Sequence, residues 1–168
     1  MYVKIRGETA ADLPEIEAVT VSAFRNARHS RHTEQRIIDA LRQTGKLAVS
    51  LVAEANGTII GHVAVSPVTL SNRASGWFGL GPVSVLPNHQ RRGVGSRLIW
   101  KALRTLRQRG ASGCVVLGDP AYYGRFGFQA DPNLSLPGAP HEYFQALSFD
   151  TPRPRASVEY PEAFKAGD

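Results

Sequence analysis

The sequence contains a single cysteine, Cys114, so no disulfide bond can form within the chain. Chains so poor in cysteine are typical of reducing compartments. No apolar run reaches the roughly 18 residues that a membrane-spanning helix requires. The first thirteen residues also lack the apolar stretch of a signal peptide. These absences argue against a disulfide-stabilised scaffold and a membrane protein, and we expect a cytoplasmic location.

Acidic residues are outnumbered, because 20 Lys and Arg face 14 Asp and Glu, which gives a net charge of +6. Such an excess implies an anionic partner but leaves nucleic acid, a membrane surface and a polyanionic cofactor open. One basic cluster spans Arg25–Arg36 and the other spans Arg91–Arg109. Aromatic residues make up only 8% of the chain, and the second cluster contains just one of them, Trp100. Arg97, Lys101, Arg104 and Arg107 therefore favour a solvated helix face over a nucleic-acid surface.

Hydrophobic periodicity predicts an alternation of strands and helices along one chain. Asn56-Gly57 is a strong hairpin signal, and Pro82 predicts a bulge or a local edge in the strand that contains it. The predicted elements are, in order, a strand at Tyr2–Arg6, helices at Thr9–Phe24 and Thr33–Gly45, a hairpin at Lys46–Leu70, a strand at Gly76–Pro87, a helix at Val94–Gly110, a buried parallel strand at Gly113–Gly118, a short helix within Asp119–Phe128, a strand at His141–Phe149 and a proline-rich tail on the surface.

The segment Gln90-Arg91-Arg92-Gly93-Val94-Gly95 follows a strand and opens a helix. A helix N-terminus presents unpaired backbone N–H groups and a positive dipole end, and glycines let an anion approach closely. The two arginines add donors that suit phosphate. No Gly-Lys-Ser/Thr occurs, which excludes a P-loop, and Leu98 replaces the third glycine of a dinucleotide fingerprint. The segment therefore predicts a phosphate site of another kind.

This Q-x-x-G-x-G pattern, together with a later Y-x-x-x-G-F at Tyr123–Phe128, resembles the GNAT superfamily of N-acetyltransferases. The amino-acid sequence around these motifs is most similar to the YhbS-like branch of that superfamily. The resemblance covers nearly the whole chain. It implies an α/β (α+β) fold with a central mixed, mostly antiparallel sheet, one bulged and splayed strand, and helices on both faces. We expect one domain at 1–168, with a cofactor-binding core at 77–128 and a C-terminal strand and tail at 141–168.

The resemblance also implies an enzyme that transfers an acetyl group from acetyl-CoA to a primary amine by direct attack in a ternary complex, without a metal. Tyr123 matches the family's general acid, with its neighbour Tyr122 as the alternative. Asp119 lies in the segment where many relatives have a cofactor-contacting asparagine. The implied cofactor-binding residues are Val83, Ser84, Val85, Gln90, Arg91, Arg92, Gly93, Val94, Gly95, Ser96, Asp119 and Tyr123.

The general base is open, because Trp77–Leu86 has no acidic residue where many relatives carry a glutamate. Ser84 acting through a water, His62 and Glu34 are the candidates, although His62 also suits a structural role. Cys114 lies in an apolar run and suits the core. His29 and His32 have helical spacing but no cysteine or carboxylate converging on them, so a zinc site is not favoured.

Two other functions stay open: an acyl-CoA-binding sensor without catalysis and, less favoured, a basic nucleic-acid-binding protein. The acceptor could be a small molecule or a protein amine, and the Arg25–Arg36 cluster would suit an acceptor with a carboxylate or phosphate. A homodimer is an expectation from the family resemblance only.

Overall fold

The computed structural model describes residues 1–28 and 30–166, so His29 of the disfavoured zinc pair lies outside the described residues. Its largest sheet has seven strands in the order β1-β2-β3-β5-β6-β9-β7. All neighbouring strands are antiparallel except β5 and β6, which confirms the predicted mixed, mostly antiparallel sheet. The strands are β1 (Lys4–Gly7), β2 (Val49–Ala55), β3 (Thr58–Pro67), β5 (Trp77–Val85), β6 (Gly113–Leu117), β7 (Gln129–Ala130) and β9 (Phe144–Ser148).

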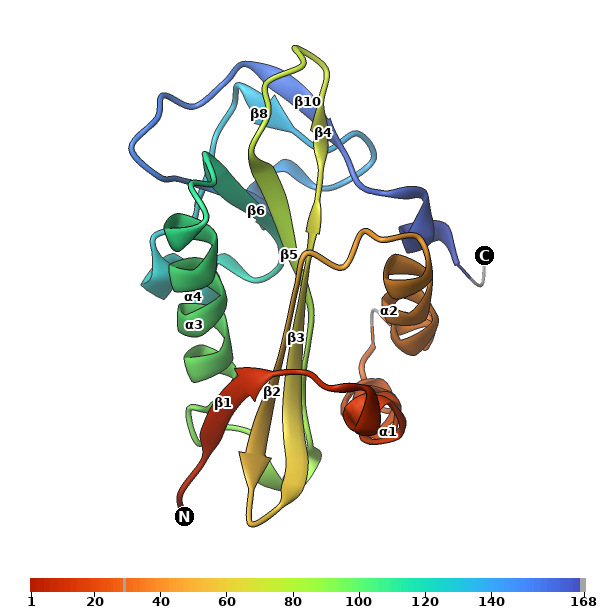
Figure 1. Cartoon of the computed structure of the whole chain (residues 1–168). Helices are drawn as coiled ribbons and strands as arrows, with labels where there is room; N and C mark the ends of the chain where they lie inside the picture. Colours follow the sequence, from red (N-terminus) through yellow and green to blue (C-terminus); the bar gives the residue numbers. More distant parts are fainter. Residues whose placement is uncertain (29, 167–168) are drawn as a thin grey trace.

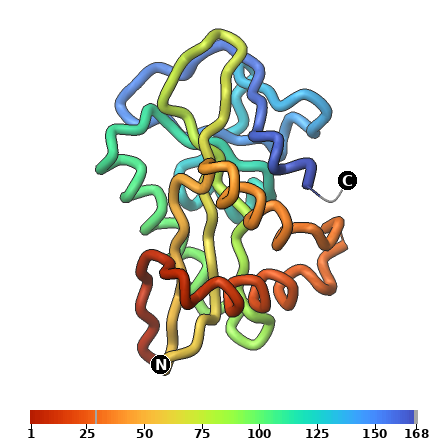
Figure 2. Tube along the Cα trace, turned by 45° about the vertical axis from the view of Figure 1, so that its right-hand side comes forward, coloured from red at the N-terminus to blue at the C-terminus, as the bar shows by residue number. Residues whose placement is uncertain are grey.

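Helices cover both faces of this sheet, as the sequence predicts (Figure 1). The helices α1 (Leu13–Phe24) and α2 (Glu34–Gln43) lie on one face, and α3 (Val94–Gln108) lies on the other. A short helix, α4 (Pro120–Tyr123), follows β6. The view in Figure 2 shows the N-terminal helices crossing in front of the sheet. We call the two sides the α3 face and the α1–α2 face.

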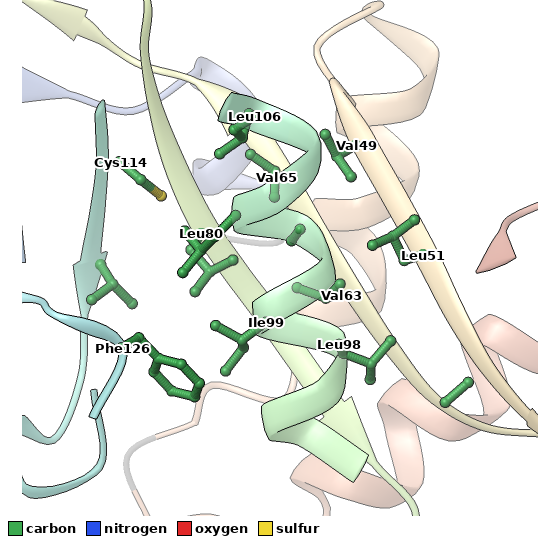
Figure 3. Packing of buried hydrophobic residues seen from close by; sticks show 14 of the residues in the cluster. Val49, Leu51, Val63, Val65, Leu80, Leu98, Ile99, Leu106, Cys114 and Phe126 are labelled. Carbon is green, nitrogen blue, oxygen red and sulfur yellow. The ribbon is translucent and has the colours of Figure 1, made fainter. Parts of the chain in front are cut away.

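The main core lies between α3 and the sheet (Figure 3). The buried stripe of α3 consists of Val94, Leu98, Ile99, Ala102, Leu103 and Leu106, at the helical spacing that the sequence shows. These side chains pack against residues of β2, β3 and β5, including Val63 and Leu80. Burial of each large aliphatic side chain contributes about 1.5–3 kcal/mol. Cys114 is fully buried in this cluster, which confirms the prediction that it belongs to the core.

The bulge predicted from Pro82 is present in β5. Val63 pairs with Val83 and Val65 pairs with Leu80, so two residues of β5 stand opposite the single residue Ala64. The Gly81-Pro82 peptide bond there is cis. Pairing between β5 and β6 is confined to Trp77–Gly79 with Gly113–Val115. Beyond the bulge, β5 stays paired with β3 and β6 stays paired with β9, so the two parallel neighbours separate and leave a slot.

The structure differs from the sequence prediction in three details. The last strand of the main sheet begins at Phe144, because His141–Tyr143 forms a 3-10 turn after Pro140. The tail contains a strand, β10 (Ala156–Glu159), which joins β4 (Thr69–Leu70) and β8 (Leu134–Ser135) in a second, three-stranded sheet. Thr33 stands at the start of α2, as expected, but its side chain makes no capping hydrogen bond.

Among the described residues, the helices are too short or too polar to cross a membrane. The expected domain limits, 1–168 with parts at 77–128 and 141–168, stay a prediction.

Candidate active site

The turn before α3 presents backbone donors to one side of the molecule. Arg91 and Gly93 both have left-handed backbone angles, with φ of 63° and 83°. Gly93 caps α3, and within the described part of the chain there is no side-chain capping hydrogen bond at this helix start. Four N–H groups at a helix start lack partners within the helix, and neighbouring N–H groups in such turns form concave anion sites. The predicted phosphate site therefore has the required backbone geometry.

Beyond the bulge, the backbone groups of β5 that face away from β3 point into the slot. Leu86 N–H donates to the Ile60 carbonyl of β3. Because backbone groups alternate in direction along a strand, Val85 and Val83 direct theirs away from β3. The Gln90 side chain accordingly donates to the Val85 carbonyl from that side, at 3.0 Å. The slot therefore offers the edge of a strand to an extended ligand.

A cavity of about 390 Å³ joins the turn to the slot. Eight predicted cofactor-binding residues line it, namely Val83, Val85, Gln90, Arg91, Gly93, Gly95, Ser96 and Tyr123. Gly95 matters here for space: a Cβ atom at this position would lie 3.3 Å from the Tyr122 hydroxyl. We call this cavity the turn cavity. It lies where β5, the turn before α3 and the segment Tyr122–Arg125 meet.

The structure leaves four predicted residues outside this lining. Ser84 is fully buried and pairs with His62 across the sheet, so its side chain points away from the cavity. Val94 is part of the core and offers only its backbone. Asp119 caps α4 by accepting a hydrogen bond from Ala121 N–H at 2.9 Å. Arg92 is exposed beside the turn.

Three residues of the turn cavity are absent from the predicted set: His89, Tyr122 and Arg125. The Arg125 guanidinium stacks over the Tyr122 ring at 4.4 Å, and the Tyr122 hydroxyl lies 3.3 Å from Ser96 Oγ. Arg125 could have been predicted from the sequence, because it is a cation two residues after Tyr123 in the same motif. His89 carried none, because its approach depends on the 3-10 turn Pro87–His89.

A second cavity of about 700 Å³ lies where the α1–α2 face meets the slot, and we call it the apolar cavity. Its walls are Phe24 of α1, Glu34 and Ile37 of α2, Leu80–Val83, Leu117, Tyr123, the loop Leu136–Pro140, and Tyr160 and Phe164 of the tail. Glu34 is the one carboxylate among them. Arg25 and the other cations of the Arg25–Arg36 cluster do not line it, so the geometry gives no support to an anionic acceptor there.

Tyr123 and Val83 line both cavities and therefore mark their junction. The Tyr123 ring packs against Tyr122 and Phe128 in T-shaped contacts, with centroid distances of 5.0 and 6.1 Å. Its position requires Gly118, because a Cβ atom there would lie 2.4 Å from the ring. Burial, and then the neighbouring Tyr122, raise the pKa of Tyr123 to about 12. The phenol therefore keeps its proton across the neutral range.

His62 belongs to a buried network away from both cavities. Its Nε2 lies 2.8 Å from Ser50 Oγ, and Ser50 in turn donates to Glu8. Arg42 of α2 donates twice to Glu8, at 2.9 and 3.1 Å. Burial lowers the pKa of His62 to about 4, so the imidazole is neutral at pH 7. This placement favours the structural role. Of the three candidate bases, only Glu34 lines a cavity that meets Tyr123.

Within residues 1–28 and 30–166, no three His, Cys, Asp or Glu side chains come close enough together to hold a metal ion.

Comparison with known proteins identifies the class. Residues 13–128 match the model of the acetyltransferase (GNAT) family, so the chain belongs to the GNAT family. It is 35% identical over 126 residues to the Escherichia coli K12 N-acetyltransferase YhbS, a match that covers 74% of this chain and 72% of YhbS.

Two solved structures are similar over nearly the full length. A GNAT-family acetyltransferase from Brucella melitensis, solved in complex with acetyl-CoA, is 46% identical with a TM-score of 0.87, covering 97% of this chain and 98% of its own. Escherichia coli YhbS, solved in complex with CoA, is 32% identical with a TM-score of 0.87, covering 99% and 93%. The predicted membership of the family and the fold are thus confirmed.

Proposed function

We propose that this protein transfers an acetyl group from acetyl-CoA to a primary amine, which attacks directly while both substrates are bound. The observation that carries the proposal is the junction of the two cavities at Tyr123 and Val83. One cavity has the features of a phosphate and strand-edge site, and the other is an apolar chamber for a second molecule. The complexes of the Brucella relative with acetyl-CoA and of YhbS with CoA support the choice of donor.

The residues present fit acetyl-CoA. Backbone N–H groups at the start of α3 and the Arg91 guanidinium would hold the pyrophosphate. The outward backbone groups of Val83 and Val85 would hold the pantetheine amides in the slot. When bound, acetyl-CoA supplies an activated thioester. The Val83 N–H, at the junction, is placed to polarise the thioester carbonyl, a kind of stabilisation that often dominates acyl transfer.

The acceptor amine would enter from the apolar cavity. Its lining of aliphatic, proline and aromatic residues suits an acceptor with an apolar body, and the Glu34 carboxylate would attract its ammonium group. The Ser30 hydroxyl donates to both Glu34 oxygens, at 2.7 and 2.8 Å, and orients the carboxylate. We therefore assign Glu34 to binding the amine, which must reach the junction as the free base to attack.

Tyr123 would protonate the departing thiolate. The amine nitrogen bonds to the carbonyl carbon, the carbon–sulfur bond breaks, and the sulfur takes the phenolic proton; the proton released by the nitrogen restores the phenol. Because its pKa is raised to about 12, the Tyr123 phenol is protonated at neutral pH. Among the described residues, no hydrogen bond involves the Tyr123 hydroxyl, which leaves it available to the substrate.

The test is to compare Tyr123→Phe with Tyr122→Phe, using release of the CoA thiol across a panel of apolar primary amines. Loss of general acid catalysis should lower kcat of Tyr123→Phe by about 100-fold or more, while the Kd for acetyl-CoA, from calorimetry, stays within about twofold. Tyr122→Phe should keep most of the rate. A fully active Tyr123→Phe would remove the acid assignment. Wild-type protein that binds acetyl-CoA but acetylates no amine would favour the sensor instead.

A further inference from the structure

A third cavity, of about 700 Å³, lies between the edge strand β1 and α3 and shares no lining residue with the apolar cavity. Figure 1 shows α3 on the side of the sheet away from α1 and α2. We call it the β1–α3 groove. Its lining consists of Tyr2, Val3, Lys4, Ile5, Arg97, Trp100, Lys101, Leu103, Arg104 and Arg107. Val3 and Leu103 are buried and form its floor, and the remaining side chains stand around it. The groove plays no part in the proposed acetyl transfer.

The groove is strongly positive. Five of its residues are cations, and its lining has no Asp or Glu. Among the described residues, none of the five is in an ion pair with a carboxylate. Arg97, Lys101 and Arg104 follow one another at spacings of four and three residues on α3, where like charges repel. Such a cluster is stabilised when an anion binds and spans it.

The groove also carries two exposed aromatic rings. Tyr2 is 81% exposed and Trp100 is 52% exposed, although tryptophan is usually much more buried. The Trp100 ring is fixed from one side by Phe126, with centroids 5.1 Å apart at 69°. The Trp100 ring is therefore held in place by Phe126 while about half of the residue stays exposed to solvent. The sequence hides this combination, because Tyr2 is almost a hundred residues from the basic helix that it joins.

We propose that the β1–α3 groove binds single-stranded nucleic acid, with phosphates on the cations of α3 and bases stacked on Trp100 and Tyr2. Cations that follow a backbone, alternating with aromatic platforms, are the features by which proteins bind single strands without sequence preference. A second copy of this chain docked symmetrically, groove against groove, would bring the same positive charge into it. An acidic peptide would pair with the cations but would leave the two rings without planar partners.

The experiment measures fluorescence anisotropy of labelled oligothymidylate and oligouridylate of about 12 nucleotides, within the usual site sizes, as salt rises from about 50 to about 300 mM. Micromolar binding with a steep salt dependence is expected. Lys101→Glu/Arg104→Glu should weaken binding at least tenfold and flatten the salt slope. Trp100→Ala should weaken it by about fivefold or more without changing the slope.

The matched control is Arg28→Glu/Arg36→Glu, which makes the same charge change on exposed residues outside the groove. It should bind the oligonucleotides with less than threefold loss. All variants should keep the wild-type melting temperature and the wild-type Kd for acetyl-CoA. These two measurements distinguish weaker oligonucleotide binding at the groove from unfolding of the protein. If the control lost as much oligonucleotide affinity as Lys101→Glu/Arg104→Glu, net charge alone would explain the binding, and the proposal would be overturned. So would unchanged binding by Trp100→Ala together with equally tight binding of a polyglutamate peptide, which would assign the groove to an acidic polypeptide.

Discussion

The two faces of the main sheet are built differently. The α3 face is packed almost entirely with apolar side chains and ends in the glycine turn. The α1–α2 face includes fully buried polar side chains, among them Thr20 and His62. The first face depends on one continuous segment with regular spacing, whereas the second assembles short pieces from both ends of the chain. The turn cavity accordingly uses two short segments, residues 83–96 and 122–125, whereas the apolar cavity is lined by segments from residue 24 to residue 164.

The slot between β5 and β6 connects these two faces. Val83 and Tyr123 belong to both cavities, and Gly118 makes room for the tyrosine ring. Buried Gln145 donates to the Gly118 carbonyl at 3.0 Å and fixes that glycine from behind. The junction is thus supported from the strand β9, outside the motif that contains Tyr123.

The largest expected effect on stability concerns the α1–α2 face. Because burial holds the pKa of His62 at about 4 while an unfolded histidine titrates near 6.5, the unfolded state binds more protons between these values. Stability should therefore fall as the pH drops, by about 2 kcal/mol from pH 7 to pH 5. Urea unfolding at several pH values measures this. His62→Gln, which stays neutral, should lose most of the dependence; an unchanged dependence would place its origin elsewhere.

The next effect concerns the turn cavity. Arg91 and Arg92 are both exposed, but of the two only Arg91 lines the cavity. Arg91→Glu should raise the Kd for acetyl-CoA by about 30-fold, or about 2 kcal/mol, since it removes a charged hydrogen bond and adds repulsion. Arg92→Glu makes the same charge change and should cost clearly less. Calorimetric titration of acetyl-CoA into both variants measures the two Kd values. Equal losses of affinity would indicate that the overall positive charge near the start of α3 attracts the ligand, rather than a direct contact with Arg91.

The smallest effect concerns the apolar cavity. Glu34→Gln should raise KM for the amine by about fivefold, or about 1 kcal/mol, because a partly exposed ion pair contributes little. The affinity for acetyl-CoA should not change. Glu17→Gln, on exposed residue 17 of α1, serves as the control. Steady-state kinetics with varied amine would contradict the assignment if Glu34→Gln lowered kcat and left KM unaltered.

Sequence reasoning recovered the parts of the site that depend on local patterns. The stripe of α3, the glycine turn and the Pro82 bulge are each encoded within a few residues, and all three are present. It could not separate Arg91 from Arg92, because the left-handed angle at Arg91 decides which side chain faces the cavity. It assigned Asp119 to the cofactor but did not show that this side chain caps α4, and the cofactor assignment stays a prediction. The second sheet was missed because β4 and β8 have two residues each and lie far apart in sequence.

The C-terminal tail forms a wall of the apolar cavity. Tyr160 and Phe164 line it and meet in a T-shaped contact, with ring centroids 4.8 Å apart. Tyr160 packs so closely on Gly79 that a Cβ atom there would lie 2.6 Å from the ring. The match to the GNAT family ends at residue 128, before this wall begins. Under the proposed function, the tail therefore helps to set which amine the apolar cavity accepts, whereas the turn cavity lies within the matched residues 13–128. A chimera that exchanges only the tail with a relative is the corresponding route to an enzyme of altered acceptor preference.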